Sequence, residues 1–576
     1  MKRILAFALM ATSGLSFAQD PVVSAQVRMS PDALSNSGDE TSAVATANGL
    51  DIIGGFNDYR TDGTIKASFG TSSDGGATWA HVLVRPPVAN QTTVEGDPMA
   101  IYDERTNTVW AGAIAFGGNG GIYLAKKNIG SNTYQASVMA RVSGGADKEW
   151  GCASIIPGNP NSTRLYIVYN EGVIRSDNLG STWTTPLSLG SGLGFLPRNG
   201  PNGELYVTYW DTSFGIKFRR SLDGGLTFSA AVNAATRLAT WGVQNFAIPG
   251  NFRNPPIHTM AVNPVTGDIV IMWFDQTNTV GGQRNLDLYM TKSTNQGTTW
   301  SAATRLPFRP LSQVSDMIYP WIEFTKDGRL HLLTFDTQYT PNQTDGVSHG
   351  LWDQTYYYSD DEGTTWSSNF RLTPSSWDSF NDGRNAGVSF LGDYEGIGIS
   401  DRYVYPVYPD TRTNQAEIYT NKIYNPIYRP SSFNFFRGLL VSGVLSSLFL
   451  NDGNIMVARP GLTINAGEAP IQLETVTSGL TPPSQLKIYV QSSVSSVNIQ
   501  QEILMLNVNT GQWDSIDVRL ATTSESNTTV TVTNPSNYIN VGNGQARTRV
   551  AYKPVGPVSN PNWQATIDQD VLLVYP

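Results

Sequence analysis

Short runs in which apolar and polar residues alternate recur through about residue 425, separated by turns rich in Gly, Asn and Asp. One group of three such runs covers 258–263, 268–275 and 287–293. Alternation with a period of two places one side of a strand in a core and the other side toward solvent. Equivalent groups begin about 58 residues apart on average, near Val44, Asp97, Asp147, Gly194, His258, Pro320 and Gly392. The pattern therefore predicts seven repeats of a small antiparallel sheet.

An eight-residue turn motif, called the turn box below, marks five of the repeats. It reads S-x-D-x-G-x-T-W/F at 72–79, 221–228 and 359–366, and Asn replaces Asp at 176–183 and 293–300. A short carboxylate or amide side chain accepts hydrogen bonds from N–H groups of its own turn, and the Gly supplies a positive φ. The Thr and the aromatic residue then lead into a fourth strand, where the aromatic ring packs between neighbouring units. We interpret the turn box as structural, without a catalytic part.

The last repeat lacks a fourth strand. It ends at 418–422 without a turn box, whereas the strand-like segment 25–30 belongs to no repeat. Pairing of these two segments would close the ring of sheets and remove an exposed sheet edge. The sequence thus predicts a seven-bladed β-propeller over residues 19–428. Six blades is the alternative, because the second unit carries only a degenerate box at 126–133.

The composition changes after Pro426 and Pro430. Beyond them there are no turn boxes, and alternating runs such as 486–490 and 529–533 indicate strands with one solvent-exposed face. The simplest account is a C-terminal β-sandwich domain over residues 431–576. The predicted fold class is therefore all-β, a propeller followed by a sandwich.

Composition and charge exclude several classes of function. The counts of Gly (55), Trp (14), Tyr (25) and Phe (22) are typical of tight turns between strands that carry aromatic residues. The net charge of −9 gives no reason to expect nucleic acid as a partner. A single cysteine, Cys152, excludes an intrachain disulfide and a cysteine-cluster metal site. The four histidines show no paired spacing, so no zinc site is expected.

The first eighteen residues have the pattern of a signal peptide. Lys2 and Arg3 precede the apolar stretch 4–10, and 16–18 is a small-residue cleavage site. No later stretch reaches the ~18 apolar residues of a membrane span, so an integral membrane protein is not expected. The sequence predicts an exported protein that is secreted, periplasmic or attached to the cell surface.

The turn boxes resemble the Asp-box (BNR-repeat) motifs of the sialidase superfamily, and the resemblance covers most of residues 25–425. It implies a propeller whose boxes lie on one face and whose active site lies on the other. It also implies a glycoside hydrolase with a Tyr nucleophile, a Glu that activates it and an Asp general acid. An arginine cluster is implied as well, because guanidinium groups bind the carboxylate of the substrate in a bidentate manner.

The resemblance assigns roles to particular residues. The segment 392–395 is similar to the one that carries the nucleophile, here Tyr394, and 56–62 is similar to the element with a binding-site arginine, Arg60, and the acid/base, Asp62. Arg28 matches the first arginine of the family, and Asp410 falls where the family places a Glu that supports it. The arginine expected before the last box is absent from 348–359. Arg284 has the right local context one unit too early, Arg384 and Arg412 are substitutes without motif support, and no Glu is assigned to activate Tyr394.

Acidic residues recur at two kinds of position on the predicted active-site face. The second strand ends in an acid in six units, at Asp58, Glu171, Asp211, Asp275, Asp336 and Asp410. The loops leading into the first strands add Glu95, Asp97, Asp147, Glu149, Asp393 and Tyr394. Each acid could cap its own loop. Alternatively, the acids form a ring of carboxylates that binds sugar hydroxyls or Ca²⁺.

These patterns lead to one predicted function and two alternatives. The prediction is a carbohydrate-directed, sialidase-like propeller acting on a glycan or glycoconjugate as an exo-acting glycoside hydrolase, with Tyr394 and Asp62 catalytic and no cofactor except Ca²⁺ in the case of a carboxylate ring. Substrate binding is assigned to Arg28, Asp58, Arg60, Arg284, Asp410 and Arg412. The first alternative is a non-catalytic propeller that binds glycan or protein without a complete arginine triad. The second is a surface or structural protein attached through its C-terminal domain.

Overall fold

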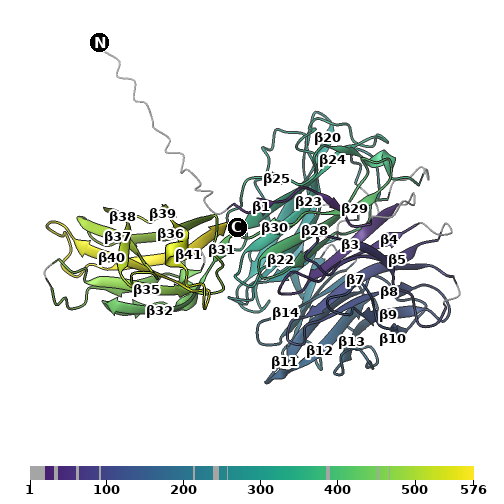
Figure 1. Ribbon diagram of the computed structural model, residues 1–576. Helices are drawn as coiled ribbons and strands as arrows, with labels where there is room; N and C mark the ends of the chain where they lie inside the picture. The colour runs from purple at the N-terminus through teal and green to yellow at the C-terminus, as the bar shows by residue number, and fades with distance from the viewer. Residues whose placement is uncertain are drawn as a thin grey trace, which may run out of the picture. The chain divides into compact units, whose positions relative to one another are not determined.

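The computed structural model describes residues 20–30, 37–59, 64–89, 92–211, 215–237, 246–255, 257–384, 390–449, 453–465 and 467–575. These residues are almost entirely in strands and turns, with three short 3₁₀ helices, η1 (Ser379–Asn381), η2 (Leu445–Leu448) and η3 (Pro535–Tyr538). No helix in the described ranges is long and apolar enough to cross a membrane. The chain divides into two compact units, Val22–Asn425 and Pro426–Pro576 (Figure 1).

The described part of Val22–Asn425 forms seven antiparallel sheets, numbered 1 to 7 in chain order. Sheet 1 contains β3 (Gly38–Ala45), β4 (Ile52–Asp58), β5 (Lys66–Ser72) and β6 (Ala80–Leu83). Sheet 2 contains β7 (Glu95–Asp103), β8 (Thr108–Ala115), β9 (Gly121–Lys126) and β10 (Val138–Val142). Sheet 3 contains β11 (Trp150–Ile156), β12 (Asn159–Tyr169) and β13 (Gly172–Ser176). Sheet 4 contains β14 (Leu193–Asn199), β15 (Leu205–Trp210), β16 (Gly215–Ser221) and β17 (Val232–Thr236).

The remaining three sheets complete this unit. Sheet 5 contains β18 (Thr259–Val262), β19 (Ile269–Val280), β20 (Gln283–Ser293) and β21 (Thr304–Arg305). Sheet 6 contains β22 (Met317–Phe324), β23 (Leu330–Asp336), β24 (Leu351–Ser359), β25 (Phe370–Arg371) and β26 (Trp377–Asp378). Sheet 7 contains β27 (Gly396–Ile399), β28 (Tyr403–Asp410), β29 (Glu417–Thr420) and β30 (Ile423–Tyr424), together with the N-terminal strands β1 (Val22–Val23) and β2 (Val27–Arg28).

The first strands of the seven sheets contact one another in a closed ring. The contacting pairs run β3–β7, β7–β11, β11–β14, β14–β18, β18–β22, β22–β27 and back from β27 to β3. The N-terminus completes sheet 7, because Val27 pairs with Thr420 and Arg28 with Tyr419. The predicted pairing of segment 25–30 with 418–422 is therefore confirmed. A closed ring of antiparallel sheets is the arrangement of a β-propeller.

Each of the five turn boxes forms the same set of hydrogen bonds after the third strand of its sheet. In the box of sheet 1, the Ser72 hydroxyl donates to Asp74 Oδ1 at 2.8 Å, and Asp74 Oδ1 accepts the Thr78 N–H at 2.9 Å. In the Asn-containing box of sheet 5, Asn295 Oδ1 accepts the Thr299 N–H at 2.9 Å. The Trp300 ring of that box lies edge-on to Phe218 of sheet 4, with ring centroids 5.1 Å apart. Trp300 is half-buried, so the box aromatic packs between neighbouring sheets without being sealed in the core.

The unit Pro426–Pro576 consists of two further sheets. One contains β33 (Leu439–Ser442), β34 (Met456–Arg459), β41 (Ala565–Tyr575), β36 (Gln485–Val494) and β39 (Ser526–Val532), with β31 (Ile427–Tyr428) pairing beside β41. The other contains β32 (Pro430–Arg437), β35 (Ile471–Thr477), β40 (Ala546–Pro554), β37 (Ile499–Leu506) and β38 (Trp513–Leu520). Apolar side chains of both sheets, among them Ile488, Leu572, Ile503 and Val550, share one core.

A buried acid between these two sheets predicts a pH-dependent stability. The Thr475 hydroxyl donates to Asp570 Oδ2 at 3.1 Å, and burial raises the pKa of Asp570 to about 7. Because this folded-state pKa exceeds the unfolded value, the stabilisation is present at low pH and is lost as the pH rises through 7. Asp570→Asn removes this titration. The free energy of unfolding of the variant minus that of the wild type is expected to be about 2–3 kcal/mol larger at pH 8 than at pH 5. Calorimetric melting at the two pH values checks this, and an equal difference at both would contradict it.

Candidate active site

The first strands begin with a recurring backbone distortion. Four residues that are not glycine have positive φ at this position, namely Glu40 (50°), Asp97 (51°), Lys148 (49°) and Tyr319 (51°). The pairing register shifts at this point in β3, β7 and β22, as in a β-bulge. A left-handed conformation costs about 1–2 kcal/mol for such residues. Bulges that turn a side chain in a new direction are frequent beside active sites. Because the positive φ recurs in four sheets, this end of the ring is the candidate site.

The topology assigns the turn boxes to the other end of the sheets. Neighbouring strands are antiparallel, so the starts of the first and third strands and the ends of the second and fourth strands share one end. The turn boxes follow the third strands and therefore lie at the opposite end. The separation of the boxes from the candidate site thus follows from the strand order alone.

Lys148 holds together carboxylates from three different sheets. Its ammonium group lies 3.2 Å from Glu40 Oε1 and 2.8 Å from Asp393 Oδ2, and its backbone N–H donates to Asp97 Oδ2 at 3.2 Å. Asn57 extends the network by donating to Asp39 Oδ1 at 3.0 Å and to Glu40 Oε2 at 2.6 Å. The set Asp39, Glu40, Asp97, Lys148, Glu149 and Asp393, with Arg253 and Arg384, is called the buried charge cluster below.

The environment of the cluster separates the proton affinities of its acids. Burial raises the pKa of Asp39 to about 7 and that of Asp393 to about 6, although Arg384 and Lys148 respectively oppose the rise. Burial also acts to raise the pKa of Glu40, but Lys148 and the hydrogen bond with Asp97 outweigh it, and the pKa of Glu40 is lowered. Glu40 therefore stays ionised near neutral pH, whereas Asp39 and Asp393 can exchange protons there. Acid–base chemistry needs groups whose affinities differ in this way.

Tyr394 lies against this cluster. Its ring is edge-on to Trp150 at 4.8 Å between centroids, and Lys148 Nζ lies 5.3 Å from the ring centroid. The side chain is nearly buried, with 3% exposed. Burial, followed by the charges of Asp97 and Glu40, raises the pKa of the phenol well above its usual value. Tyr394 is therefore protonated at neutral pH, and it needs a base before it can act as a nucleophile.

Glu149 has the properties of such a base. It is buried, and neither carboxylate oxygen has a partner on another residue in the described ranges. Burial raises the pKa of Glu149 well above its usual value, with Asp97 adding to the rise. The ionised form is therefore a stronger proton acceptor than an exposed glutamate, although a smaller fraction of Glu149 is ionised at neutral pH. The charge of Glu149 also acts on the Tyr394 phenol. Glu149 is the second residue after Asp147 in the loop before β11. The sequence had marked it as one of the acids in these loops but had not assigned it to activate Tyr394.

Two arginines lie at the edge of the cluster, and each is paired with a carboxylate. Arg384 lies 2.7 Å from Asp39 Oδ2, and its guanidinium stacks over the Tyr59 ring at 4.3 Å. Arg253 pairs with Asp393. Both guanidiniums face the Phe390 ring, at 5.0 Å for Arg253 and 5.5 Å for Arg384. The sequence offered Arg384 as a substitute without motif support and gave no indication of Arg253.

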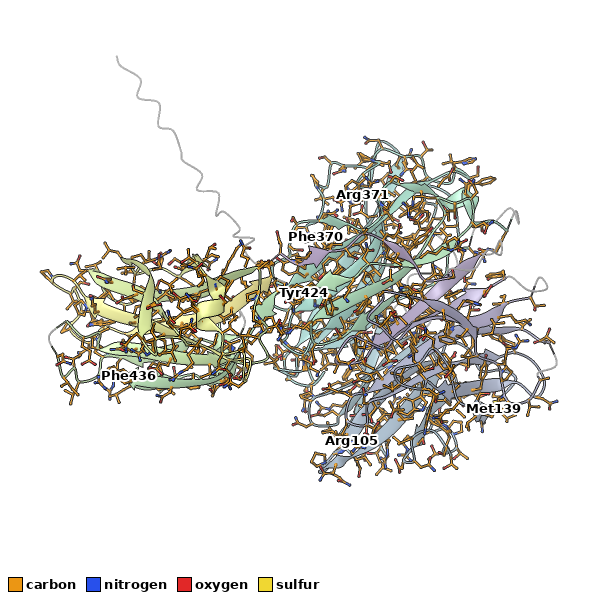
Figure 2. All side chains as sticks on the ribbon, viewed as in Figure 1. Arg105, Met139, Phe370, Arg371, Tyr424 and Phe436 are labelled. Atoms are coloured by element: carbon orange, nitrogen blue, oxygen red, sulfur yellow. The ribbon has the colours of Figure 1, made fainter. Side chains whose placement is uncertain are left out.

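Arg28 belongs to a brace that repeats in three successive sheets. In each of these sheets, an arginine on the fourth strand lies opposite a residue of the third strand. The arginine binds the carboxylate that stands two positions before that residue on the third strand. Arg305 pairs opposite Tyr289 and binds Asp287 at 2.7 Å, Arg371 pairs opposite Thr355 and binds Asp353 at 2.8 Å, and Arg28 pairs opposite Tyr419 and binds Glu417 at 2.8 Å. Figure 2 labels Arg371, the arginine of sheet 6, next to Phe370. Arg28 is thus tied to its own sheet, and no described contact joins it to Tyr394.

The other residues singled out from the sequence lie as follows. Asp410 binds Arg412 at 2.8 Å and accepts from Gln26 at 3.2 Å. Asp58 accepts from the Ser68 hydroxyl at 2.5 Å and lies 3.1 Å from His81 Nε2. The Arg284 guanidinium lies 5.6 Å from the Phe246 ring. Arg60 and Asp62 lie outside the described residues.

The acids that end the second strands mostly cap their own loops. Asp275 accepts the Gln276 N–H at 2.8 Å, Asp336 that of Gln338 at 2.5 Å, and Asp410 that of Arg412 at 2.9 Å. Among the described residues, no group of three or more His, Cys, Asp or Glu side chains is arranged to hold a metal ion. In the buried charge cluster, the Lys148 ammonium itself lies between the carboxylates of Glu40 and Asp393.

Two cavities extend from the middle of the ring toward the turn-box end. One of about 170 Å³ is lined by Trp150, Cys152 and Trp321, and another of about 240 Å³ is lined by Val262, Phe324 and Lys326. Both are bordered by Arg198 and Glu323, which form an ion pair. Trp150 and Trp321 also contact the Tyr394 ring, so the indole rings lie between the smaller cavity and Tyr394.

Comparison with known proteins gives only distant likenesses. No family model matches the chain, and no curated protein matches it. A protein of unknown function from Dyadobacter fermentans has 15% identity and a TM-score of 0.39, over 70% of this chain and 99% of its own. The intramolecular trans-sialidase of Ruminococcus gnavus has 15% identity and a TM-score of 0.34, over 68% of this chain and 95% of its own. A sialidase of Streptococcus pneumoniae has 13% identity and a TM-score of 0.36, over 69% of this chain and 70% of its own. Likenesses at these scores assign nothing to this chain.

Proposed function

We propose that the chain is a carbohydrate-directed, sialidase-like propeller that acts as an exo-acting glycoside hydrolase, with Tyr394 as nucleophile and Asp62 as acid/base. One observation carries the proposal: a protonated, buried Tyr394 lies against a charge cluster in which Glu149 has two carboxylate oxygens without partners. A nucleophile, a base and several polar groups at one end of a ring of strands are what such a reaction requires.

The proposal extends to the architecture and the location of the protein. The seven sheets serve as the blades of a seven-bladed propeller over residues 19–428, and the two C-terminal sheets serve as a β-sandwich over 431–576. Residues 1–18 act as a signal peptide, so that the mature protein is secreted, periplasmic or located at the cell surface and meets its glycan there. The closed ring of first strands and the shared C-terminal core support the architecture.

In the proposed reaction, Glu149 accepts the phenolic proton while Tyr394 Oη forms a bond to the anomeric carbon. The bond from that carbon to the leaving oxygen breaks, and Asp62 donates a proton to the leaving group. A water molecule, deprotonated by Asp62, then attacks the anomeric carbon, and Tyr394 leaves with the proton held by Glu149. Lys148, 5.3 Å from the ring centroid, stabilises the developing phenolate. Two displacements at one carbon retain its configuration.

Replacement of Tyr394 by Phe tests this role. We expect Tyr394→Phe to lower the turnover of fluorogenic glycosides at least ~10³-fold, because the nucleophilic oxygen is lost while the ring packing stays. Tyr405→Phe is the matched control. That residue is equally buried in sheet 7, its hydroxyl donates to the Gly49 carbonyl at 3.2 Å, and its loss should leave turnover within a few-fold. If Tyr394→Phe kept a tenth of the wild-type rate, this assignment would be wrong.

The near-complete burial of Tyr394 favours a second candidate function, a non-catalytic propeller that binds glycan or protein. In that case the wild-type protein would bind glycans without turning any over, and Tyr394→Phe would leave binding unchanged. Calorimetric titration with the products of the same glycosides separates the two functions.

A further inference from the structure

We infer that the substrate of this site is an uncharged sugar, held through its hydroxyl groups, and not a sugar that carries a carboxylate. The inference rests on the proposed function and narrows it to a substrate class. It follows from three features of the site. Its arginines already form ion pairs within the chain, several of its buried carboxylate oxygens have no hydrogen-bond donor on another described residue, and its cations are paired with carboxyl groups.

The arginines at the cluster already have carboxylate partners within the chain. Arg384 binds Asp39 at 2.7 Å and lies 3.3 Å from Asp382, and Arg253 binds Asp393. Asp39 and Asp393 are fully buried. A substrate carboxylate that took Arg384 would leave Asp39 without its described ion-pair partner, and one that took Arg253 would leave Asp393 with Lys148 alone. Loss of one member of a buried ion pair is strongly unfavourable.

Several arginines outside the buried charge cluster are also paired with carboxylates of the chain. Arg28 is the third member of the repeated brace and binds Glu417, and Arg412 binds Asp410. Within residues 22–425, Arg60 is the arginine that falls outside the described ranges. Arg284 stacks over Phe246 without a described ion pair, and no described contact joins it to the buried charge cluster. The described residues therefore place no unpaired guanidinium beside Tyr394, whereas a substrate carboxylate is bound by a cluster of several.

The site instead presents acceptors that have no donor. Both oxygens of Glu149 and Oδ1 of Asp393 are buried without a hydrogen-bond partner on another residue in the described ranges. Each of these side chains is at least nine-tenths buried. Buried acceptors of this kind require donors. Sugar hydroxyl groups supply such donors, whereas a carboxylate would add further acceptors and a like charge.

The charges of the cluster point the same way. Five carboxyl groups, Asp39, Glu40, Asp97, Glu149 and Asp393, face three cations, Lys148, Arg253 and Arg384. Lys148, Arg253 and Arg384 each lie within ion-pair distance of at least one of these carboxyl groups, so no cation of the cluster is left unpaired to bind an anion. An uncharged ligand gains hydrogen bonds here without electrostatic repulsion.

Pairs of probes that differ only in the carboxylate test the inference. We would measure kcat/KM for 4-nitrophenyl β-D-glucoside against the glucuronide, the galactoside against the galacturonide, and the 4-methylumbelliferyl glycoside of N-acetylneuraminic acid. Calorimetric titration with the free sugars reports binding without turnover. We expect at least one neutral sugar to be hydrolysed or bound ~100-fold better than its acidic counterpart. An acidic sugar that is preferred overturns the inference while the proposed hydrolase stands. Neutral sugars that bind without turnover overturn the hydrolase while the inference stands, and binding of no sugar overturns both.

A charge-neutralising variant addresses the cause. Asp39→Asn should release Arg384 and improve the acidic probes relative to the neutral ones ~10-fold, whereas Asp382→Asn, which leaves the Arg384–Asp39 pair intact, should not. An unchanged preference in a folded Asp39→Asn protein would show that the pairing does not set the substrate class. If that variant does not fold, the wild-type comparison of matched probes decides alone.

Discussion

Replacement of Lys148 by methionine is expected to lower the free energy of unfolding of the propeller by about 3–5 kcal/mol near pH 8, the cost of leaving buried carboxylates without their cation. The Lys148 side chain is 9% exposed and lies between Glu40 and Asp393. Methionine has similar length and fills the same volume, so the decrease in unfolding free energy measures the effect of removing the charge.

The loss of stability caused by Lys148→Met, called the deficit below, should increase with pH. The carboxylates raise the pKa of Lys148 well above its usual value, so its stabilising effect is fully present from pH 5 to pH 8. Without Lys148, the folded-state pKa values of Asp97 and Asp393, which already exceed their unfolded values, rise further, and that of Glu40, which Lys148 helps to lower, also rises. The variant therefore loses more stability than the wild type as the pH increases, and the deficit should be smaller at pH 5 than at pH 8.

Lys326 provides the matched control. It also bridges two carboxylates, Glu104 and Asp401, but its side chain is 49% exposed. Lys326→Met should therefore cost less than about 1 kcal/mol. Calorimetric melting of both variants at pH 5 and 8 checks the prediction, and equal small losses would mean that the cluster does not depend on its lysine.

The second large effect is expected at Arg329, whose side chain is fully buried. Its Nε and terminal nitrogen bind the two oxygens of Asp360 at 2.8 Å each, and its guanidinium stacks over the Tyr358 ring at 3.9 Å. Arg329→Met should cost about 3–5 kcal/mol, because Asp360 loses both bonds and the ring loses its cation. Arg329→Lys should recover only part of this, since an ammonium cannot form the two parallel bonds.

An exposed arginine pair sets the scale for this prediction. Arg519 binds Asp517 at 2.6 Å with a side chain that is 39% exposed, and Arg519→Met should change the stability by less than about 1 kcal/mol. A similarly small change for Arg329→Met would show that the stacked pair contributes little.

The sequence alone determined the repeat and its local chemistry. The turn boxes place Ser, Asp or Asn, Gly and Thr within eight residues, and their hydrogen bonds form inside that window. The unmatched segment at 25–30 predicted the closing strand, because an open sheet edge has a high cost wherever it occurs. The candidate site was predicted only in part: Asp97, Glu149, Asp393 and Tyr394 follow from their repeated position, but the bonds between them do not.

Tertiary structure decided which charges meet. Lys148 joins Glu40 and Asp393, which lie 108 and 245 residues away in the chain, and no local pattern encodes that pairing. Arg28 has the sequence context of a binding arginine, yet its strand register places it beside Glu417. Strand register and ring closure determine which residues of distant strands lie side by side. A bulge with positive φ turns a side chain in a direction that strand alternation does not predict. Residue types and spacing therefore determined the sheets and the boxes, whereas the network around Tyr394 arises only when the ring is closed.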